Sequence, residues 1–196
     1  MKEILKLILV LTTICLVSAL ALSQVYEATR DRIAHQKRLE VLRAIRAVLP
    51  DIDNEPDKDT VRLQVGKTGR GEPEEVTFFR GRRGGKLTGI AFVVVSRHGY
   101  GGDIEIMLGL DPEGVILGVE IVSQMETPGL GAKIVNKSFR QQFVGRRLDN
   151  TRWAVKKDGG EIDQITGATI SPRAVVEAIH RGLVIYQKNR EKILGG

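Results

Sequence analysis

An apolar run near the amino terminus constrains the fold of this chain more than any other feature. Residues 4–22 contain one charged side chain, Lys6, which lies near the end of the run. As a helix with ~1.5 Å rise per residue, the run spans roughly 28 Å, close to the thickness of the hydrocarbon core of a bilayer. Lys6 can extend its ammonium group to the headgroups. We therefore predict a transmembrane anchor over residues 1–23, in contact with the lipid bilayer.

A cleaved signal peptide is the alternative. Ala19-Leu20-Ala21 matches an A-x-A cleavage site and the start of the chain is basic, so that the mature chain would begin at Leu22. The run is long for the apolar region of a signal peptide, which favours a retained anchor. Thr13-Ile14, before Cys15, lacks the small residue that a lipoprotein cleavage site requires. Basic residues lie on both sides of the run, so the positive-inside rule does not decide the orientation.

Composition leaves room for one domain beyond the anchor and excludes several kinds of site. The chain has 196 residues and is 42% apolar, enough for one ordinary core. Cys15 is the single cysteine, which excludes an internal disulfide and a cysteine-ligated iron–sulfur or zinc centre. His35, His98 and His180 are scattered along the sequence, and we assign none of them to a metal.

Two short basic clusters contribute to the formal net charge of +6. They are Arg80-Gly81-Arg82-Arg83 and Arg146-Arg147. Nucleic-acid binding is a poor explanation, because an anchor precedes them and only 5% of the residues are aromatic. We predict solvated loops that favour anionic headgroups or acidic partner subunits.

The segment after the anchor reads as a charged connecting helix over residues 24–50. Ile33, Val41, Leu42, Ile45, Val48 and Leu49 form one apolar stripe, and Pro50 ends the helix. Residues 51–60 are acidic and rich in turn formers, which indicates a loop. The remaining domain is expected over residues 51–196.

Short apolar or alternating segments within this domain predict strands. Glycine-rich, charged stretches at 66–75 and 80–85 flank a short strand at 76–79, and further strands are expected at 86–97, 103–110 and 115–122. Turn residues at 111–114 separate the last two. Helices are expected at 132–143, with Ile134, Val135, Phe139 and Phe143 inward, and at 172–188. The fold class is therefore α+β: an antiparallel sheet with flanking helices, on a single N-terminal transmembrane helix.

The start of the last helix carries the most specific motif, Thr166-Gly167-Ala168-Thr169. Ser171 is a suitable N-cap and Pro172 suits the first helical position. Helix N-termini present unpaired N–H groups and favour negative charge. A hydroxyl there, between small residues, is well placed to contact or carry a phosphate. The alternative is an ordinary capped turn, since short motifs occur by chance.

The context of this motif resembles the FMN-binding domain family. Residues 163–169, Asp-Gln-Ile-Thr-Gly-Ala-Thr, resemble its flavinylation motif; residues 109–131 and 153–160 resemble two other blocks. The resemblance runs from about Tyr100 to about Ile185, and is greatest to the G subunits of Rnf ion-translocating electron transport complexes. It implies FMN held by a phosphoester on Thr169 and attached by a separate flavin transferase that uses FAD. It also implies other membrane subunits of the complex as partners, an inner-membrane location and a periplasmic domain.

The same resemblance implies a set of cofactor-binding residues. Glu126, Thr127, Gly129 and Leu130 would adjoin the isoalloxazine; without the resemblance their loop reads as a tight connection. Tyr100, in a Gly-Tyr-x-Gly match, would line the pocket, or else belongs to a turn. Lys156 and Lys157 would neutralise the flavin phosphate, or else face water. Trp153 is assigned to the core in preference to a stack on the cofactor. With Thr169, the set is Thr166, Gly167, Ala168, Glu126, Thr127, Gly129, Leu130, Tyr100, Lys156 and Lys157.

Electron relay is the function this reading favours. The sequence has no nicotinamide-binding G-x-G-x-x-G after a strand and no apparent catalytic triad, so we expect no independent catalysis. One alternative is the covalent-FMN C subunit of a sodium-pumping NADH:quinone reductase, which is usually longer between anchor and motif. The other is a membrane-anchored binding module without redox turnover. Visible absorbance that survives denaturation separates the redox and non-redox readings.

Overall fold

Helix α1 (Lys2–Val48) is the first element of the computed structural model, which describes residues 2–67 and 73–195. It is one uninterrupted helix and ends just before Pro50, as the sequence predicts. By length and composition it is able to cross a membrane, and the large apolar side chains of its first turns are exposed. The chain divides into two compact units, Met1–Glu40 and Val41–Gly196. The last two turns of α1 therefore belong to the folded domain.

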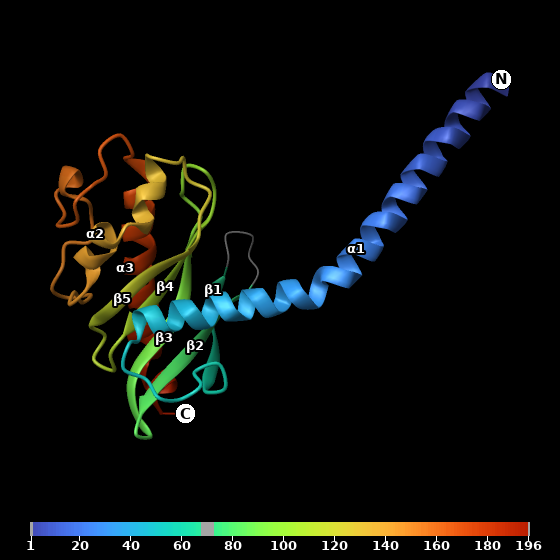
Figure 1. Ribbon diagram of the computed structural model, residues 1–196. Helices are drawn as coiled ribbons and strands as arrows, with labels where there is room; N and C mark the ends of the chain where they lie inside the picture. The colour runs from blue at the N-terminus through green and yellow to red at the C-terminus, as the bar shows by residue number, and fades with distance from the viewer. Residues whose placement is uncertain (1, 68–72, 196) are drawn as a thin grey trace. The chain divides into compact units, whose positions relative to one another are not determined.

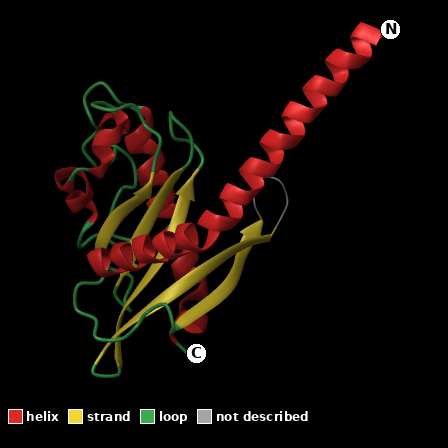
Figure 2. Cartoon of the chain, turned by 45° about the vertical axis from the view of Figure 1, so that its right-hand side comes forward, coloured by secondary structure: helices red, strands yellow, loops and turns green. Residues whose placement is uncertain are grey.

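A five-stranded sheet forms the centre of that domain (Figures 1 and 2). Each strand pairs antiparallel with the next, in the order β1-β2-β3-β4-β5, which confirms the predicted meander. The strands are β1 (Thr60–Lys67), β2 (Pro73–Arg83), β3 (Lys86–Ser96), β4 (Ile104–Leu110) and β5 (Ile116–Ser123).

The first two strands differ from the prediction. Strand β1 was not expected, and β2 extends well beyond the predicted 76–79, so the solvated loop assigned to residues 80–83 is wrong. Arg80 is buried within β2 and lies 3.6 Å from Asp59, while Arg82 Nε donates to Asp59 Oδ2 at 2.6 Å. Ion pairing explains how a basic run can lie in a strand. The middle of the loop predicted at 66–75, residues 68–72, lies outside the described residues.

One face of the sheet packs against helix α3 (Ile170–Leu194), which contacts β3 and β4. Phe78 and Phe92 meet at 4.8 Å between ring centroids and pack in the same core as Val175 and Ile179 of the helix. The helix was predicted over 172–188 and begins two residues earlier and ends six later. This face holds the main hydrophobic core and fixes the start of α3 relative to the sheet.

The opposite face receives the end of α1 over a row of glycines. Gly109 and Gly118 pair across β4 and β5, and Gly81 and Gly89 pair across β2 and β3. A Cβ at Gly109 would lie 2.6 Å from the Val48 carbonyl oxygen. Side chains at Gly109 and Gly118 would push the helix off the sheet, so these two glycines permit direct contact between the α1 backbone and the strands, whereas Gly81 and Gly89 face the side chain of Leu49.

The helix predicted over 132–143 is wrong as a single element. The segment forms a 3₁₀ turn η1 (Gly131–Val135), a short helix α2 (Lys137–Arg140) and a 3₁₀ turn η2 (Gln141–Phe143). Asn136 is extended, with ψ of 138°, and breaks the run. Asn disfavours helix interiors because its side chain competes for backbone hydrogen bonds. Of the predicted inward residues, Ile134, Phe139 and Phe143 are buried, whereas Val135 is 40% exposed.

Candidate functional site

A tight turn delivers the chain to the start of α3. The Ala168 N–H donates to the Ile165 carbonyl at 3.0 Å, and Gly167 between them has φ of +79°. That conformation is the one a type II turn requires at its third residue, and glycine adopts it without strain. Thr169 follows at the N-cap position of α3, and its hydroxyl makes no capping hydrogen bond within the described chain. The hydroxyl is therefore left available beside the first N–H groups of the helix.

Ser171 does not cap the helix, so that prediction is wrong. It is buried in the first turn of α3, and its hydroxyl donates to Glu126 Oε2. A buried carboxylate needs hydrogen-bond donors, and this requirement prevails over the local capping preference. Pro172 is consequently the third helical residue, where its missing N–H still costs nothing because first-turn N–H groups lack partners within the helix.

Glu126 joins the helix to a second loop. Its carboxylate is buried, with 4% of the residue exposed, and Oε1 accepts the Gly101 N–H at 2.9 Å. The two loops touch backbone to backbone: a Cβ at Gly101 would lie only 1.8 Å from the Met125 carbonyl oxygen. The loop after β3, the loop after β5 and the start of α3 thus meet at one buried carboxylate.

A cavity of about 450 Å³ opens between these three segments. It falls within the size range of small-molecule sites. The structure brings together in its walls most of the residues that the sequence singled out, namely Tyr100, Glu126, Thr127, Leu130, Gly167, Ala168 and Thr169. Three further residues, Gly131, Ile170 and Ser171, also line it. Gly131 belongs to the segment at 109–131 that resembles the family, but it was not predicted to bind the cofactor. No feature of the local sequence marked Ile170 as a site residue.

Four of the residues expected at the site do not line this cavity. Thr166 and Gly129 are exposed members of the two lining loops. Lys156 and Lys157 begin the short 3₁₀ turn η3 (Lys156–Asp158), also exposed, where Lys156 Nζ lies 2.6 Å from Asp163 Oδ1.

The segment before the motif is attached to α3 by two contacts. Arg173 forms a bidentate pair with Asp158, with nitrogen–oxygen distances of 2.5 and 2.6 Å, and its hydrogen bonds hold the pKa of Asp158 below the ordinary value. Trp153 is half-buried, packs against the core and stacks on His180 at 6.1 Å between ring centroids. This position agrees with the assignment of Trp153 to the core.

The basic pair at 146–147 lies in a loop, as predicted, but its charges are compensated. Arg146 Nη1 donates to Glu161 Oε2 at 2.8 Å, and this hydrogen bond is the main cause of the lowered pKa of Glu161. Arg147 pairs with Asp149 at 2.6 Å.

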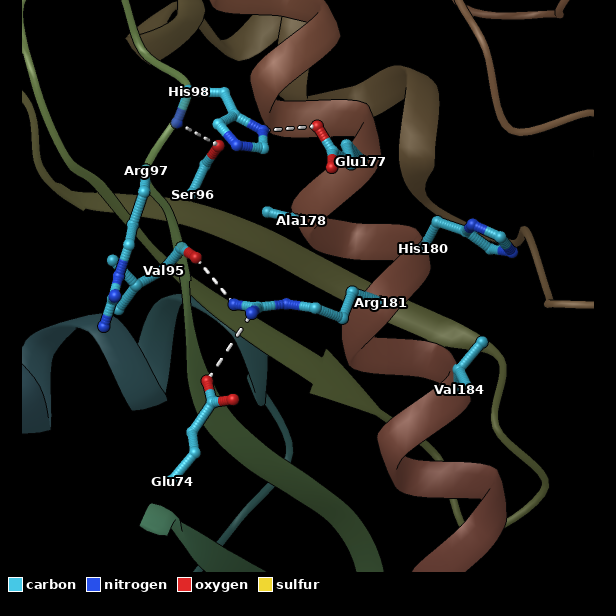
Figure 3. A pocket seen from close by; sticks show the side chains of 10 residues that line it. All are labelled: Glu74, Val95, Ser96, Arg97, His98, Glu177, Ala178, His180, Arg181 and Val184. Atoms are coloured by element: carbon cyan, nitrogen blue, oxygen red, sulfur yellow. Dashed lines mark hydrogen bonds and ion pairs between the residues drawn. The ribbon is translucent and has the colours of Figure 1, made fainter. Parts of the chain in front are cut away.

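A second cavity, of about 530 Å³, lies between the end of β3 and α3 (Figure 3). Figure 3 shows His98 facing Glu177 and Arg181 reaching the Val95 carbonyl. His98 Nδ1 lies 2.9 Å from Glu177 Oε2, and Arg181 donates to the Val95 carbonyl at 2.7 Å. Arg181 also lies 3.6 Å from Glu74. The side chains at 98 and 181 are thus engaged by carboxylates of the cavity's own walls. Among the described residues there is no group of three or more His, Cys, Asp and Glu able to hold a metal ion.

Comparison with known proteins finds a matching family model and similar curated sequences. Residues 99–184 match the model of the FMN-binding domain. The G subunit of the ion-translocating oxidoreductase complex of Aliivibrio fischeri is 35% identical over 95% of this chain and 91% of its own length. Its counterpart in Cereibacter sphaeroides is 39% identical, over 95% of this chain and 85% of its own.

Two solved structures share the fold at low sequence identity. NqrC of Shewanella oneidensis superposes with a TM-score of 0.63 and 16% identity, covering 83% of this chain and 100% of that one. The C subunit of the Na(+)-translocating NADH-quinone reductase from Parabacteroides distasonis gives 0.60 and 18%, covering 83% and 96%. At these identities the likeness concerns the architecture alone.

Proposed function

This chain belongs to the family of G subunits of ion-translocating oxidoreductase complexes, and on that premise we propose that it relays electrons through FMN attached covalently to Thr169. Its relatives are G subunits of ion-translocating oxidoreductase complexes, and residues 99–184 of this chain match the FMN-binding domain. The FMN-binding domain of the family spans the cavity residues from Tyr100 to Ser171.

The observation that carries the proposal is the place of the Thr169 hydroxyl. It lies at the N-cap of α3, lines the cavity and makes no capping hydrogen bond within the described residues. The amides of the first turn and the helix dipole favour the negative charge of a phosphodiester at that point. A phosphoester on Thr169 would therefore have hydrogen-bond donors, and the remainder of the cofactor would extend into the cavity.

The walls also suit a flavin ring system. Tyr100, Leu130 and Ile170 are 70%, 43% and 45% exposed, so they offer apolar surface that a planar ring would cover. Gly167 leaves space beside Leu130: a Cβ there would already lie 3.2 Å from its Cδ2. When bound, FMN supplies the capacity to accept and release electrons, while the chain provides binding, orientation and electrostatics.

Attachment requires a second enzyme, a flavin transferase that uses FAD. The Thr169 oxygen attacks the phosphorus of the FMN half, the pyrophosphate P–O bond breaks, AMP leaves, and the hydroxyl proton passes to a base on the transferase. Gly167 is exposed and lacks a side chain, which lets that enzyme approach closely. Asp163, also exposed, is available for recognition.

We further propose that residues 1–23 anchor the protein in the bacterial inner membrane, with residues 24–50 as the connecting helix and 51–196 as a periplasmic domain. The apolar first part of α1 supports the anchor, and the family supports its place in a membrane complex. Mass analysis of the membrane-purified protein is expected to find the amino-terminal region intact. A mature chain beginning at Leu22 would contradict the retained anchor.

Two threonine variants test the attachment site. The protein is produced with a flavin transferase, and covalent flavin is measured by intact mass and by absorbance that survives denaturation. Thr169→Val removes the nucleophile and keeps the shape, so it is expected to lose the flavin and keep the fold. Thr166→Val is the matched control and is expected to retain it. Covalent flavin on Thr169→Val, or none on the parent protein, would overturn the proposal; the latter would favour a non-redox binding module.

The relay role is tested with the loaded, purified protein alone. We expect reduction by dithionite and negligible turnover with NADH. Rapid NADH oxidation would contradict a relay. The alternative function, that of a quinone reductase C subunit, is supported only by shared architecture at 16–18% sequence identity, whereas the G-subunit relatives reach 35–40% identity. We therefore expect co-purification to recover the other subunits of an ion-translocating oxidoreductase complex.

A further inference from the structure

Glu126 occupies an unusual position for a carboxylate that lines a cavity. It is 4% exposed, and both of its oxygens are already engaged: Oε1 by the Gly101 N–H at 2.9 Å and Oε2 by the Ser171 hydroxyl. An oxygen pair that only accepts is the hydrogen-bonding pattern of an ionised carboxylate. Each oxygen thus accepts one hydrogen bond from the protein, and the side chain joins the three walls of the cavity.

The surrounding glycines reserve space for this one group. A Cβ at Gly131 would lie 2.5 Å from Glu126 Oε2 and 2.4 Å from Ser171 Oγ. A Cβ at Gly99 would lie 2.8 Å from Glu126 Oε1. Glycine on both sides of the carboxylate keeps it within bonding distance of both donors. The sequence therefore provides both the carboxylate of Glu126 and the glycines at 99 and 131 that leave space for it.

Within the described part of the chain, no cationic side chain shares the cavity wall with the charge of Glu126. Among the described residues that line the cavity, Glu126 is the only one with a charged side chain. Lys156 and Lys157, which were expected to neutralise the flavin phosphate or else to face water, are exposed and do not line the cavity. A buried negative charge opposes the addition of electrons to a group held next to it, because Coulomb interactions are strong where water is excluded.

We propose that Glu126 is a positioning residue with two effects: its carboxylate closes the cavity by joining the loop at 99–102 to α3, and its charge lowers the reduction potential of the bound flavin. The second effect rests on the proposed function, whereas the first does not. It follows that the geometry and the charge of Glu126 can be separated by substitution.

Two substitutions separate them, with Glu75→Gln as a matched control because Glu75 lies on β2, outside the cavity wall. Glu126→Gln keeps an acceptor for Gly101 and offers an N–H to the Ser171 oxygen, but removes the charge. We expect normal covalent loading and a flavin midpoint potential above that of both the parent and Glu75→Gln. Glu126→Ala removes the junction, so the unloaded protein should melt at a lower temperature and acquire less flavin.

Three measurements decide the outcome: thermal unfolding of unloaded protein, covalent flavin by intact mass, and midpoint potential by spectroelectrochemical titration. A midpoint potential for Glu126→Gln equal to that of Glu75→Gln would overturn the electrostatic effect. Parent-like melting and loading of Glu126→Ala would overturn the joining role. Failure of the parent to take up flavin would instead overturn the proposed function and, with it, the effect on potential; the melting comparison would still decide the joining role.

Discussion

Gly101→Ala is the substitution whose effect on the cavity can be worked most directly from the structure. The added Cβ would lie 1.8 Å from the Met125 carbonyl oxygen and 2.5 Å from its carbon. Contacts below 3.0 Å are not tolerated, so the two loops must separate by about 1.2 Å. Neither contact atom belongs to a flexible side chain. A comparable displacement takes the Gly101–Glu126 hydrogen bond, now 2.9 Å, beyond bonding distance.

The expected cost has two parts. Overpacking costs about 1–3 kcal/mol, and a lost hydrogen bond to a charged group about 1.5–3 kcal/mol. Even the lower values sum to about 2.5 kcal/mol. For a protein of this size, each kcal/mol lowers the unfolding midpoint by about 2–4 °C. We therefore expect the midpoint of Gly101→Ala to fall by at least about 5 °C.

Fluorescence of Trp153, the only tryptophan, provides the assay, since it packs against the domain core and does not report on the anchor. The full-length, unloaded protein is melted in detergent. Gly66→Ala is the control, because no described atom lies within 4 Å of the position of its Cβ, and we expect a change within about 0.5 kcal/mol. Covalent loading of Gly101→Ala should also fall. Equal midpoints for the two variants, with parent-like loading, would refute the close approach of the loops.

Three other predictions concern the rest of the domain. Gly109→Ala places a Cβ 2.6 Å from the Val48 carbonyl oxygen and should cost about 1–3 kcal/mol in thermal unfolding; unchanged stability would contradict direct contact of α1 with the sheet. Arg173 lowers the pKa of Asp158, so the stability difference between parent and Asp158→Asn should be present at neutral pH and vanish as the pH falls through and below 3.8. Burial raises the pKa of Tyr186 from 10.0 to about 12, so the parent should lose stability relative to Tyr186→Phe between those pH values; parallel pH profiles would contradict its burial.

Local periodicity was sufficient to predict the elements that pack by simple rules. Strands β3, β4 and β5 have apolar runs or alternation bounded by turn residues, and α3 has a regular apolar face. The extent of β2 was not predictable in this way. Arg80 has the local character of a loop residue, and its burial in a strand depends on tertiary contacts such as that with Asp59, which precedes β1.

The site shows the same division between local and tertiary information. The motif and the resemblance identified seven of the ten described residues that line the cavity, because short motifs keep their spacing. Ser171 was wrongly predicted to be the N-cap because its local sequence is typical of one. Its hydroxyl instead donates to Glu126, which lies 45 residues away in the sequence. Lys156 and Lys157 were expected either to neutralise the flavin phosphate or to face water, and both are exposed. Their turn carries contacts to Asp163 and, through Asp158, to Arg173.

The sheet gives the proposed cofactor a defined position relative to the end of α1. Thr169 is the N-cap of α3, whose buried face packs on β3 and β4, so a group attached there moves with the sheet. On the other face of the same sheet, Gly109 and Gly118 bring the backbone of Val48 into contact with the strands. Both attachments pass through packed secondary structure, which deforms little compared with a loop. An electron carrier needs a reproducible distance to its electron donor and acceptor. A covalent bond to the N-cap residue of a packed helix meets that need better than attachment to a flexible linker.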